Sequence, residues 1–284
     1  MLPSRAVSLG LGALDALKAV EGPLRRHVLP DHFHRVEIET NSRCNRGCGY
    51  CPVAVDPRPP YEMPESVFVG LLGQVAEMGF RGRFSPHFFG EPLLDPRLPR
   101  LCGLVRERLP GATVVIYTNG DALTPDKARA LLDAGVSLFI VTFEDGESRA
   151  FRETRAALPR LTLLRRFVVR HFDRDVTRPF NRGGTVRFVR EMRHTTCHAP
   201  AANVVIDAWG RLKLCANDYY GEEDWADLTK HRLRDVWARP EYVALRRALL
   251  RGEFRKPICR TCAGLGEHRA PLADHRSAAR PAAG

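Results

Sequence analysis

The sequence predicts an α/β fold in which a parallel sheet with covering helices is followed by a small hairpin-and-helix region. Strand-like apolar segments alternate with amphipathic helical segments from residue 35 to about residue 171. The last third then shows the pattern of one β-hairpin and a helical stretch, and it contains half of the eight cysteines. Helices between successive strands imply parallel pairing through right-handed crossovers, so polar residues at the strand ends should meet at one edge of the sheet.

The 284 residues suffice for one large domain and a smaller one. We expect a helical N-terminal extension over 1–34, the alternating core over 35–190, the hairpin-and-helix region over 191–269 and a disordered tail over 270–284. No apolar run approaches the ~20 residues that span a membrane. The stretch AVSLGLGAL is followed at once by charged residues, which favours an amphipathic helix over a secretion signal.

Forty-four basic and 33 acidic residues give the chain a net charge of +11, and nearly all of the basic residues are arginine. This bias is typical of a GC-rich genome and a solvated basic surface. A functional interpretation is docking of an acidic electron carrier, flavodoxin or ferredoxin, because opposite charge speeds encounter. Nucleic-acid binding is less favoured, since no basic helix or interleaved aromatic motif occurs. Eight cysteines without a signal peptide favour metal or redox chemistry in the reducing cytoplasm over a disulfide framework.

Each predicted element of the core has its own signal. In RVEIET (35–40), Val36 and Ile38 alternate with polar neighbours, as in a strand with one buried face. The segment TPDKARALLDAG (124–135) has an N-cap threonine, proline at the first helical position and a terminal glycine, which predicts a helix. The other core elements are helices at 64–79 and 97–109 and strands at 82–92, 112–120, 136–145 and within 160–172.

The cysteines fall into two sets. Cys44, Cys48 and Cys51 follow the first strand at spacings of three and then two residues. A tetrahedral metal or a cubane cluster takes four ligands, so this set leaves one position open. A structural zinc site completed by His27, His32 or His34 is the alternative. The second set has the four ligands of a complete cluster: Cys197, Cys215, Cys259 and Cys262.

The motif C-x3-C-x2-C after a first strand, with the aromatic Tyr50 before its last cysteine, resembles the radical S-adenosylmethionine (SAM) enzymes. The resemblance implies a partial (β/α)6 TIM barrel with a 4Fe–4S cluster on Cys44, Cys48 and Cys51. It also implies that SAM chelates the fourth iron through its amino and carboxylate groups. The open position would then be the active site.

The resemblance places the other SAM contacts where strands end. FFGEP (88–92) is similar to the family's Gly-Gly-Glu element, which holds the SAM amino group, although Phe89 replaces the first glycine. An arginine of the following helical segment (Arg149, Arg152 or Arg155) could pair with the SAM carboxylate, and simple solvation is the alternative. Ordinary turn and cap chemistry also remains an alternative for the polar strand-end residues. The implied contacts are Tyr50, Phe89, Gly90, Glu91, Thr118, Asn119, Thr142, Glu144 and Arg152.

The second cysteine set lies in an order that resembles the twitch domain, a truncated form of the SPASM module. Cys197 and Cys215 bracket a predicted hairpin with a turn at Gly210, and a helical stretch leads to Cys259 and Cys262. Four cysteines that end in C-x2-C suit zinc equally well. Behind a radical SAM core we favour an auxiliary 4Fe–4S cluster, because zinc offers no redox chemistry.

The resemblance implies that a 5′-deoxyadenosyl radical takes hydrogen from the substrate while the protein positions that substrate. Transfer of an electron to the auxiliary cluster with loss of the hydroxyl proton would give a ketone, whereas hydrogen return from a thiol would give an epimer. The spare cysteine, Cys102, shares a helix face with Leu98, Leu101 and Val105 and should be a small buried hydrophobe. We therefore favour a dehydrogenase over an epimerase. The compact form resembles family members that act on aminocyclitols or amino sugars in aminoglycoside biosynthesis.

The substrate should lie between the two clusters. NRGG (181–184) should close the side of the barrel, and Arg182 could bind a substrate hydroxyl or help to remove its proton. An amino sugar is cationic, so Asp218, Glu39 or Glu91 could answer its charge, with a structural hydrogen bond as the alternative for each. The candidate catalytic and substrate-binding residues are Arg182, Asn217, Asp218, Glu39 and His87.

Two further functions remain open. A peptide-modifying enzyme could use the positive charge to attract an acidic leader, but such enzymes often carry an extra peptide-binding domain, for which we expect no room in the short N-terminal segment. A zinc-binding interaction protein would use both cysteine sets without radical chemistry.

Overall fold

The computed structural model describes residues 32–143, 146–171, 181–187, 195–223, 225–266 and 273–274. The predicted N-terminal helix within 1–31 and the predicted SAM contact Glu144 lie outside these residues. Among the helices that the structure describes, none is both long and apolar enough to cross a bilayer.

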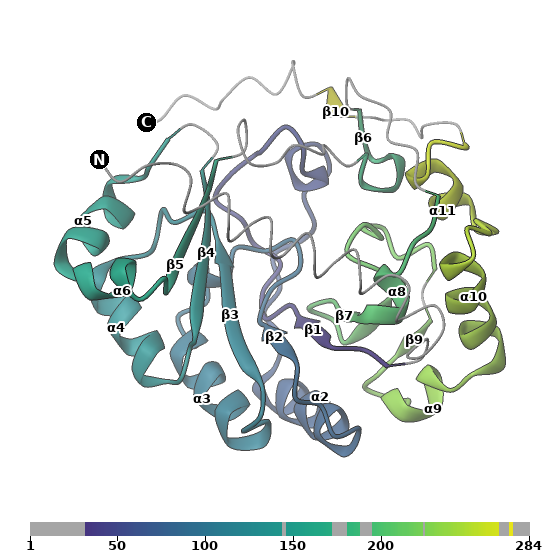
Figure 1. Ribbon diagram of the computed structural model, residues 1–284, viewed down its shortest axis with the longest axis horizontal. Helices are drawn as coiled ribbons and strands as arrows, with labels where there is room; N and C mark the ends of the chain where they lie inside the picture. Colours follow the sequence, from purple (N-terminus) through teal and green to yellow (C-terminus); the bar gives the residue numbers. More distant parts are fainter. Residues whose placement is uncertain are drawn as a thin grey trace.

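An eight-stranded sheet with the order β5-β4-β3-β2-β1-β7-β8-β9 forms the centre of the molecule (Figure 1). Pairing is parallel from β5 to β7, as the strand–helix alternation predicts, and antiparallel from β7 to β9. The strands are β1 (Arg35–Ile38), β2 (Arg83–Ser85), β3 (Thr113–Thr118), β4 (Leu138–Phe143), β5 (Phe167–His171), β7 (Asn203–Ile206), β8 (Arg211–Lys213) and β9 (Ala226–Asp227).

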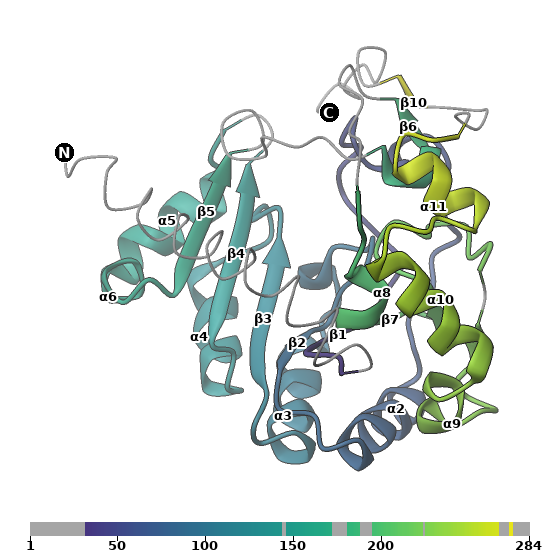
Figure 2. The same cartoon turned by 45° about the vertical axis from the view of Figure 1, so that its right-hand side comes forward.

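The helices between the parallel strands cover the outer face of the curved sheet, and the C-terminal helices lie beside its β7–β9 end (Figures 1 and 2). The covering helices are α2 (Glu65–Glu77), α3 (Leu98–Arg108), α4 (Pro125–Asp133), α5 (Arg149–Ala157) and α6 (Pro159–Leu163). The later ones are α8 (Ala199–Ala202), α9 (Leu233–Trp237), α10 (Pro240–Leu250) and α11 (Pro257–Cys262). The single helical stretch predicted before Cys259 is two helices, because Arg239 is extended and Pro240 starts a new one.

Side-chain alternation on β1 separates the core from a polar inner face. Val36 and Ile38 are fully buried and pack with Phe68 of α2, and each such side chain contributes about 1.5–3 kcal/mol of burial free energy. Arg35 and Glu37 point to the opposite side, because successive strand residues face opposite sides of a sheet. We call this side, away from the helices, the inner face.

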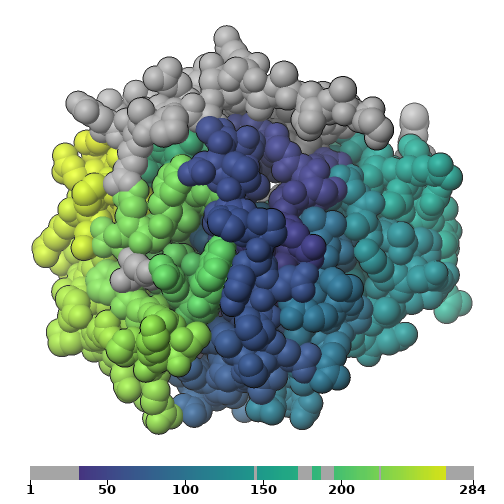
Figure 3. All heavy atoms as spheres, turned by 180° about the vertical axis from the view of Figure 1, so that it is seen from behind, coloured from purple at the N-terminus to yellow at the C-terminus, as the bar shows by residue number. Residues whose placement is uncertain are grey.

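The hairpin of the second cysteine set continues the main sheet. Strand β7 pairs in parallel with β1, with Val36 opposite Val204, and turns into β8 at Gly210, whose φ of 81° suits glycine. Gln74 of α2 donates to the Leu228 carbonyl at 2.9 Å. Viewed from behind, the dark-blue segment after the first cysteine set lies against the green segment that follows about residue 200 (Figure 3). The two cysteine sets therefore belong to one packed body.

The segment 270–284, predicted to be disordered, contributes one short strand among its described residues. Strand β10 (Ala273–Asp274) pairs in parallel with β6 (Val186–Arg187), so these two residues are not coil. The rest of that segment lies outside the described residues.

Candidate iron–sulfur and SAM site

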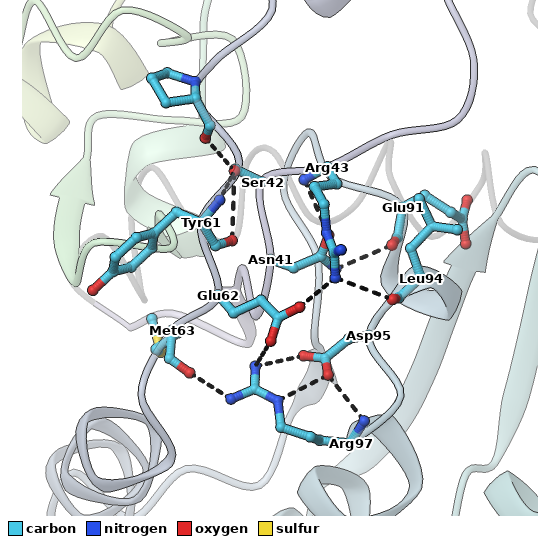
Figure 4. Close-up of polar contacts among 11 residues, drawn as sticks. Asn41, Ser42, Arg43, Tyr61, Glu62, Met63, Glu91, Leu94, Asp95 and Arg97 are labelled. Carbon is cyan, nitrogen blue, oxygen red and sulfur yellow. Dashed lines mark hydrogen bonds and ion pairs between the residues drawn. The ribbon is translucent and has the colours of Figure 1, made fainter.

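Hydrogen bonds hold the segment that leads from β1 into the first cysteine set (Figure 4). The Asn41 side chain donates to the Glu91 carbonyl at 3.1 Å, which joins the end of β1 to the turn after β2. The Ser42 hydroxyl donates to the Pro59 carbonyl at 2.7 Å and accepts from the Tyr61 N–H at 2.8 Å. These hydrogen bonds hold the two ends of the cysteine loop together, so the ends of the loop have fixed positions.

The cysteine loop is also tied to the carboxyl end of β3. Arg46 Nε donates to Asp121 Oδ2 at 2.6 Å, and Asn45 donates to the same oxygen at 3.0 Å. Asn119 in turn donates to Asn45 at 2.8 Å. The sequence analysis did not single out Asn45, Arg46 or Asp121. The sequence signal for these three residues is their position, because each is a polar residue that closely follows a cysteine or a parallel strand.

The thiols of the first set are half-buried and lie in one another's electrostatic field. The pKa of Cys44 is raised to about 11, mainly by burial and also by the charges of Glu91 and Cys51. Neutral thiols are thus favoured until a cation binds, so metal binding here would release protons. The Cys51 N–H donates to the Cys48 carbonyl at 2.8 Å, so the backbone between these two residues forms a tight turn.

Glu91 lies at the predicted SAM turn, but its carboxylate is already engaged. It is 4% exposed and accepts hydrogen bonds from the Thr118 hydroxyl at 2.7 Å and from the N–H groups of Asn119 and Leu93 at 2.9 and 3.1 Å. Burial raises its pKa. The structure therefore brings three of the predicted SAM residues together, in a network that orders the turn rather than leaving a carboxylate open.

Glu39 was predicted to pair with a positively charged substrate, but the structure gives it a different role. Its carboxylate is fully buried and accepts bonds from the N–H groups of Phe89 and Gly90 at 2.9 and 2.8 Å. It also accepts two bonds from Arg58 and one from the Ala208 N–H. Five donors saturate a carboxylate, so Glu39 orders the protein and has no capacity left for a ligand.

The other predicted SAM residues are less tightly placed. Thr142 is half-buried at the end of β4, and Tyr50 is half-buried in the cysteine loop. Arg152 is exposed on α5, whose sheet-facing residues are Phe151 and Thr154. An exposed arginine on the outer side of a covering helix is poorly placed to reach the strand ends, so this position argues against a SAM-carboxylate role for Arg152.

The four thiols of the second set converge. Burial raises the pKa of Cys215 well above its usual range, and the thiols of Cys262, Cys197 and Cys259 each raise it further. Burial likewise raises the pKa of Cys197 to about 11 and that of Cys259 to about 12. Four thiols that disfavour each other's ionisation form a site that a multiply charged cationic cluster would stabilise.

Asn217 and Asp218, predicted as substrate contacts, instead support this second set. Asn217 N–H lies 3.4 Å from the Cys215 sulfur, and its side-chain amide lies 3.7 Å from the sulfur of Cys262. Asp218 is fully buried and accepts from the N–H groups of Leu214 and Glu222 at 3.3 and 3.1 Å. Donors aimed at cysteine sulfur tune an iron–sulfur cluster, so Asn217 belongs to the cluster surroundings.

The predicted NRGG segment forms the turn η3 (Arg182–Gly184) beside α11. Arg182 adopts a φ of 49°, a left-handed conformation that is uncommon for residues other than glycine and that recurs at functional sites. Its guanidinium donates to Asn217 Oδ1 at 3.4 Å and lies 5.9 Å from the centre of the Phe89 ring. Arg182 therefore spans from the SAM-side turn to the surroundings of the second cysteine set.

Glu37 is an inner-face carboxylate that the sequence analysis overlooked. Burial raises its pKa to about 7, and the charges of Arg35, Arg182 and Arg83 oppose that rise. Among the described residues no hydrogen bond or close ion pair to its side chain is formed, in contrast to Glu39 and Glu91. The signal was present in the sequence, because Glu37 falls on the polar side of the alternating strand RVEIET.

His87, predicted to lie on a strand, follows the end of β2 (Arg83–Ser85) and lies beside Tyr117 of β3. Its ring stacks on Tyr117 with centres 4.6 Å apart, and Arg83 donates to the Tyr117 hydroxyl at 3.0 Å. Burial, with a smaller effect of the Arg182 charge, lowers the pKa of His87 to about 4, so the ring is neutral near pH 7. Its buried Nδ1 has no hydrogen-bond partner among the described residues, which leaves an acceptor or donor available there.

The geometry disfavours a zinc site built from the first set and the predicted histidines. His32 and His34 precede β1, whereas Cys44 follows its far end, and four strand residues at about 3.3 Å each separate them by more than about 13 Å. His27 lies outside the described residues. In the described part of the chain no three His, Cys, Asp or Glu side chains are arranged to hold one metal ion. A cubane needs wider spacing than the ~4 Å between thiolates on one zinc, because its cysteines bind different irons.

Comparisons with known protein families divide the chain into the same two parts, each with one set of cysteines. The model of the radical SAM superfamily matches residues 38–192. The model of the iron–sulfur cluster-binding domain called SPASM matches residues 197–263. The two matches include the first and second cysteine sets, respectively.

One curated relative and two solved structures resemble most of the chain. An S-adenosyl-L-methionine-dependent 2-deoxy-scyllo-inosamine dehydrogenase from Niallia circulans is 31% identical over 234 residues, which cover 81% of this chain and 92% of the relative. The crystal structure of BtrN with AdoMet and 2-DOIA is 28% identical, has a TM-score of 0.75 and covers 88% of this chain and 99% of its own. BtrN in an open conformation has a TM-score of 0.63 and covers 81% and 92%.

Proposed function

Because the chain belongs to the radical SAM superfamily and carries an iron–sulfur cluster-binding domain of the SPASM type, we propose that it oxidises a secondary alcohol of an aminocyclitol or amino sugar to a ketone. The family assignment confirms the predicted fold class, the use of SAM and iron–sulfur clusters, and a radical SAM oxidoreductase. The likeness to a 2-deoxy-scyllo-inosamine dehydrogenase over almost its whole length supports an aminocyclitol substrate and a role in aminoglycoside biosynthesis.

The observation that carries this proposal is the position of Arg182. It joins Asn217, beside the second cysteine set, to the face of Phe89 at the SAM-side turn. A substrate held near Arg182 would therefore lie between the two clusters. Cys44, Cys48 and Cys51 would hold the cluster that binds SAM, which would supply the radical chemistry that takes hydrogen from the carbinol carbon, and the cluster on the second cysteine set would take up the electron released when the ketone forms.

The inner face offers the groups that such a substrate needs. Arg182 can donate to the reacting hydroxyl, which would orient its carbon toward the SAM side. Neutral His87 has a buried nitrogen without a partner among the described residues, and it can accept a hydrogen bond from a neighbouring hydroxyl. Together they select for adjacent hydroxyl groups, as found on a cyclitol ring.

Glu37 is the residue that we assign to the ammonium group of the substrate. Protein donors saturate Glu39 and engage Glu91 and Asp218, whereas Glu37 has no close partner among the described residues. A bound ammonium group would lower the raised pKa of Glu37 and hold the carboxylate in its ionised form. The two groups would then form a charge-assisted hydrogen bond in a partly buried site. This replaces the earlier candidates for charge recognition.

The electron and proton balance requires an external partner. The substrate would lose two electrons and two protons. The radical derived from SAM would take one electron and one proton together as a hydrogen atom, the auxiliary cluster would take the second electron, and the hydroxyl proton would pass to a base or to solvent. We assign the role of exchanging electrons with both clusters to an acidic flavodoxin or ferredoxin, which the net charge of +11 would attract. The eight cysteines form no disulfide among the described residues, which fits iron–sulfur chemistry in a reducing cytoplasm.

The test is an anaerobic incubation of reconstituted protein with SAM, a strong reductant and 2-deoxy-scyllo-inosamine, beside the deaminated cyclitol. We expect about one 5′-deoxyadenosine per ketone with the amine and a much higher KM without it. Glu37→Gln should remove that difference between the two substrates. SAM cleavage without ketone from any aminocyclitol or amino sugar of a panel would contradict the proposal.

Epimerisation of the same substrate class is the second candidate, and the test for it is the fate of solvent deuterium. An epimerase needs a thiol that returns hydrogen to the substrate radical. The spare cysteine, Cys102, is fully buried in the core between α3 and the sheet. Its distance from the inner face therefore favours the dehydrogenase, and a product at the alcohol level with deuterium on carbon would favour the epimerase.

A further inference from the structure

The Glu39 carboxylate joins four segments that are far apart in the sequence. It accepts bonds from Phe89 and Gly90 in the turn after β2 and from Ala208 in the turn after β7. Arg58, which follows the first cysteine set, donates to both of its oxygens, at 2.9 Å in one case. Glu39 itself follows β1, so this single carboxylate fixes the relative positions of both cysteine regions.

Arg58 is enclosed by aromatic rings as well as paired with the carboxylate. Its side chain is 12% exposed, and its guanidinium carbon lies 5.7 Å from the ring centres of Phe88 and Phe89. It lies 5.6 Å from that of Trp209 and 5.3 Å from that of Tyr219. Two of these rings come from the SAM-side turn and two from the hairpin region of the auxiliary cluster. The planar guanidinium suits this combination of a bidentate bond and ring contacts better than a lysine would.

Arg58 remains charged although it is mostly buried. Burial, the largest single cause, lowers the pKa of Arg58, but the charge of Glu39, the hydrogen bonds to Glu39 and the charges of Tyr219 and Asp207 together outweigh it and the pKa is raised. A buried pair of this kind contributes little net stability compared with apolar residues, yet removal of one member leaves an uncompensated charge. We therefore expect this pair to fix the geometry of the segments that it joins rather than to add stability.

Phe89 explains why the turn departs from the glycine-rich family pattern. Its ring packs at right angles on Tyr219 with centres 4.8 Å apart, and both belong to a small apolar cluster with Phe88 and Val205. Cys51, from the first cysteine set, packs against this cluster, as does Ala216, the neighbour of an auxiliary ligand. A glycine at position 89 would remove the contact that joins the turn to the auxiliary region.

We propose that Arg58 and Glu39 are positioning residues for SAM: they hold the Phe89–Gly90 turn in the one register that meets SAM and lock it to the auxiliary-cluster hairpin. One Glu39 oxygen accepts both N–H groups of the turn, and the turn follows β2 at the carboxyl edge of the parallel strands, where ligands of such sheets bind. The inference rests on family membership and is independent of the identity of the alcohol substrate.

The test compares Arg58→Lys with Arg100→Lys in fully reconstituted protein. Arg100 also makes a two-point pair with a glutamate, Glu65, at 2.7 Å for both bonds, but on the exposed outer surface. We expect Arg58→Lys to raise the Kd for SAM by about tenfold or more, read from the change that SAM causes in the cluster's EPR spectrum, with unchanged iron content. Arg100→Lys should leave the Kd unchanged.

Two further measurements separate positioning from general destabilisation. Hydrogen exchange of the peptide that covers the Phe89–Gly90 turn should accelerate in Arg58→Lys, while peptides of α3 and α4 keep their protection. The double variant Arg58→Met with Glu39→Gln removes both buried charges and should fold, yet still bind SAM about tenfold more weakly. A Kd within twofold of the parent in either variant, with only a lower Tm, would overturn the proposal.

Discussion

Arg46 and Asp121, which are 75 residues apart, form a two-point ion pair in which Arg46 Nε lies 2.6 Å from Asp121 Oδ2. The pair joins the loop of the first cysteine set to the carboxyl end of β3, and Asn45 donates to the same carboxylate oxygen. Metal sites depend on such supporting contacts, because ligands held in place lose less conformational freedom when the metal binds. The pair is therefore part of the cluster site although neither residue is a ligand.

Changing Asp121 to asparagine should weaken the first cluster without unfolding the protein. The pair is about a quarter exposed, so its loss costs little global stability, but the cysteine loop loses an anchor. We expect SAM cleavage to fall by about tenfold, with less iron retained after gel filtration. Asp126→Asn, which breaks an exposed pair with Arg129, is the control and should keep full iron content and activity. Equal behaviour of the two variants would show that the anchor is unimportant.

Changing Cys262 to alanine should separate radical formation from oxidation. The thiols of the second set lie together, and Cys262 also accepts from Asn217. Iron should fall from about eight to about four atoms per chain, if each set holds one cubane. We expect 5′-deoxyadenosine to form still, while ketone per 5′-deoxyadenosine falls strongly, because the substrate radical cannot pass on its electron. Unchanged ketone yield would contradict an electron-accepting role for the second cluster.

Cys102→Ala should leave the product and the coupling unchanged. The thiol is fully buried among Leu98, Leu101 and Val105, and burial raises its pKa to about 12. Loss of the buried sulfur should lower the free energy of unfolding by about 1 kcal/mol. Product analysis in deuterated water checks the chemistry, and urea unfolding checks the stability. A variant that forms 5′-deoxyadenosine but no product would identify Cys102 as a hydrogen donor.

Glu37→Gln should change how stability depends on pH. Burial raises the Glu37 pKa from 4.5 to about 7, so between these values the native protein keeps a proton that the unfolded chain has lost. Stability from this group is therefore greatest at low pH and declines as the pH rises to about 7. We expect urea unfolding of the variant, between about pH 5.5 and 8, to show a smaller decline than the parent. Parallel curves for the two proteins would mean that the Glu37 carboxyl titrates normally.

Gly90→Ala should damage the SAM-side turn directly. A Cβ at this position would lie 2.0 Å from the Asn41 carbonyl oxygen, a backbone atom that cannot move aside. We expect a loss of about 2 kcal/mol in the free energy of unfolding and weaker SAM binding. Gly70→Ala in α2 meets no atom within 4 Å and should stabilise the protein by about 0.5–1 kcal/mol. Opposite shifts in thermal unfolding of the two variants would confirm the contrast.

The strand–helix alternation, the use of iron–sulfur clusters and the buried position of Cys102 are confirmed predictions from sequence, and all three depend on local patterns. Ligand spacing is encoded within a few residues, and so are the turns that carry it. Thr124 is a further example, since its side chain caps α4 as its position before proline and acidic residues predicts. Sequence alone also places Glu37 on the polar side of β1, but it does not distinguish Glu37 from the other carboxylates near the strand ends.

What the tertiary structure decided is the role of each carboxylate. Glu37, Glu39, Glu91 and Asp218 look alike in the sequence, but burial and partners separate them. The partners of Glu39 lie between 19 and 169 positions away, so no local pattern could reveal that it is saturated. Charge recognition depends on which carboxylate is left without protein donors, and that is settled only when distant segments pack together.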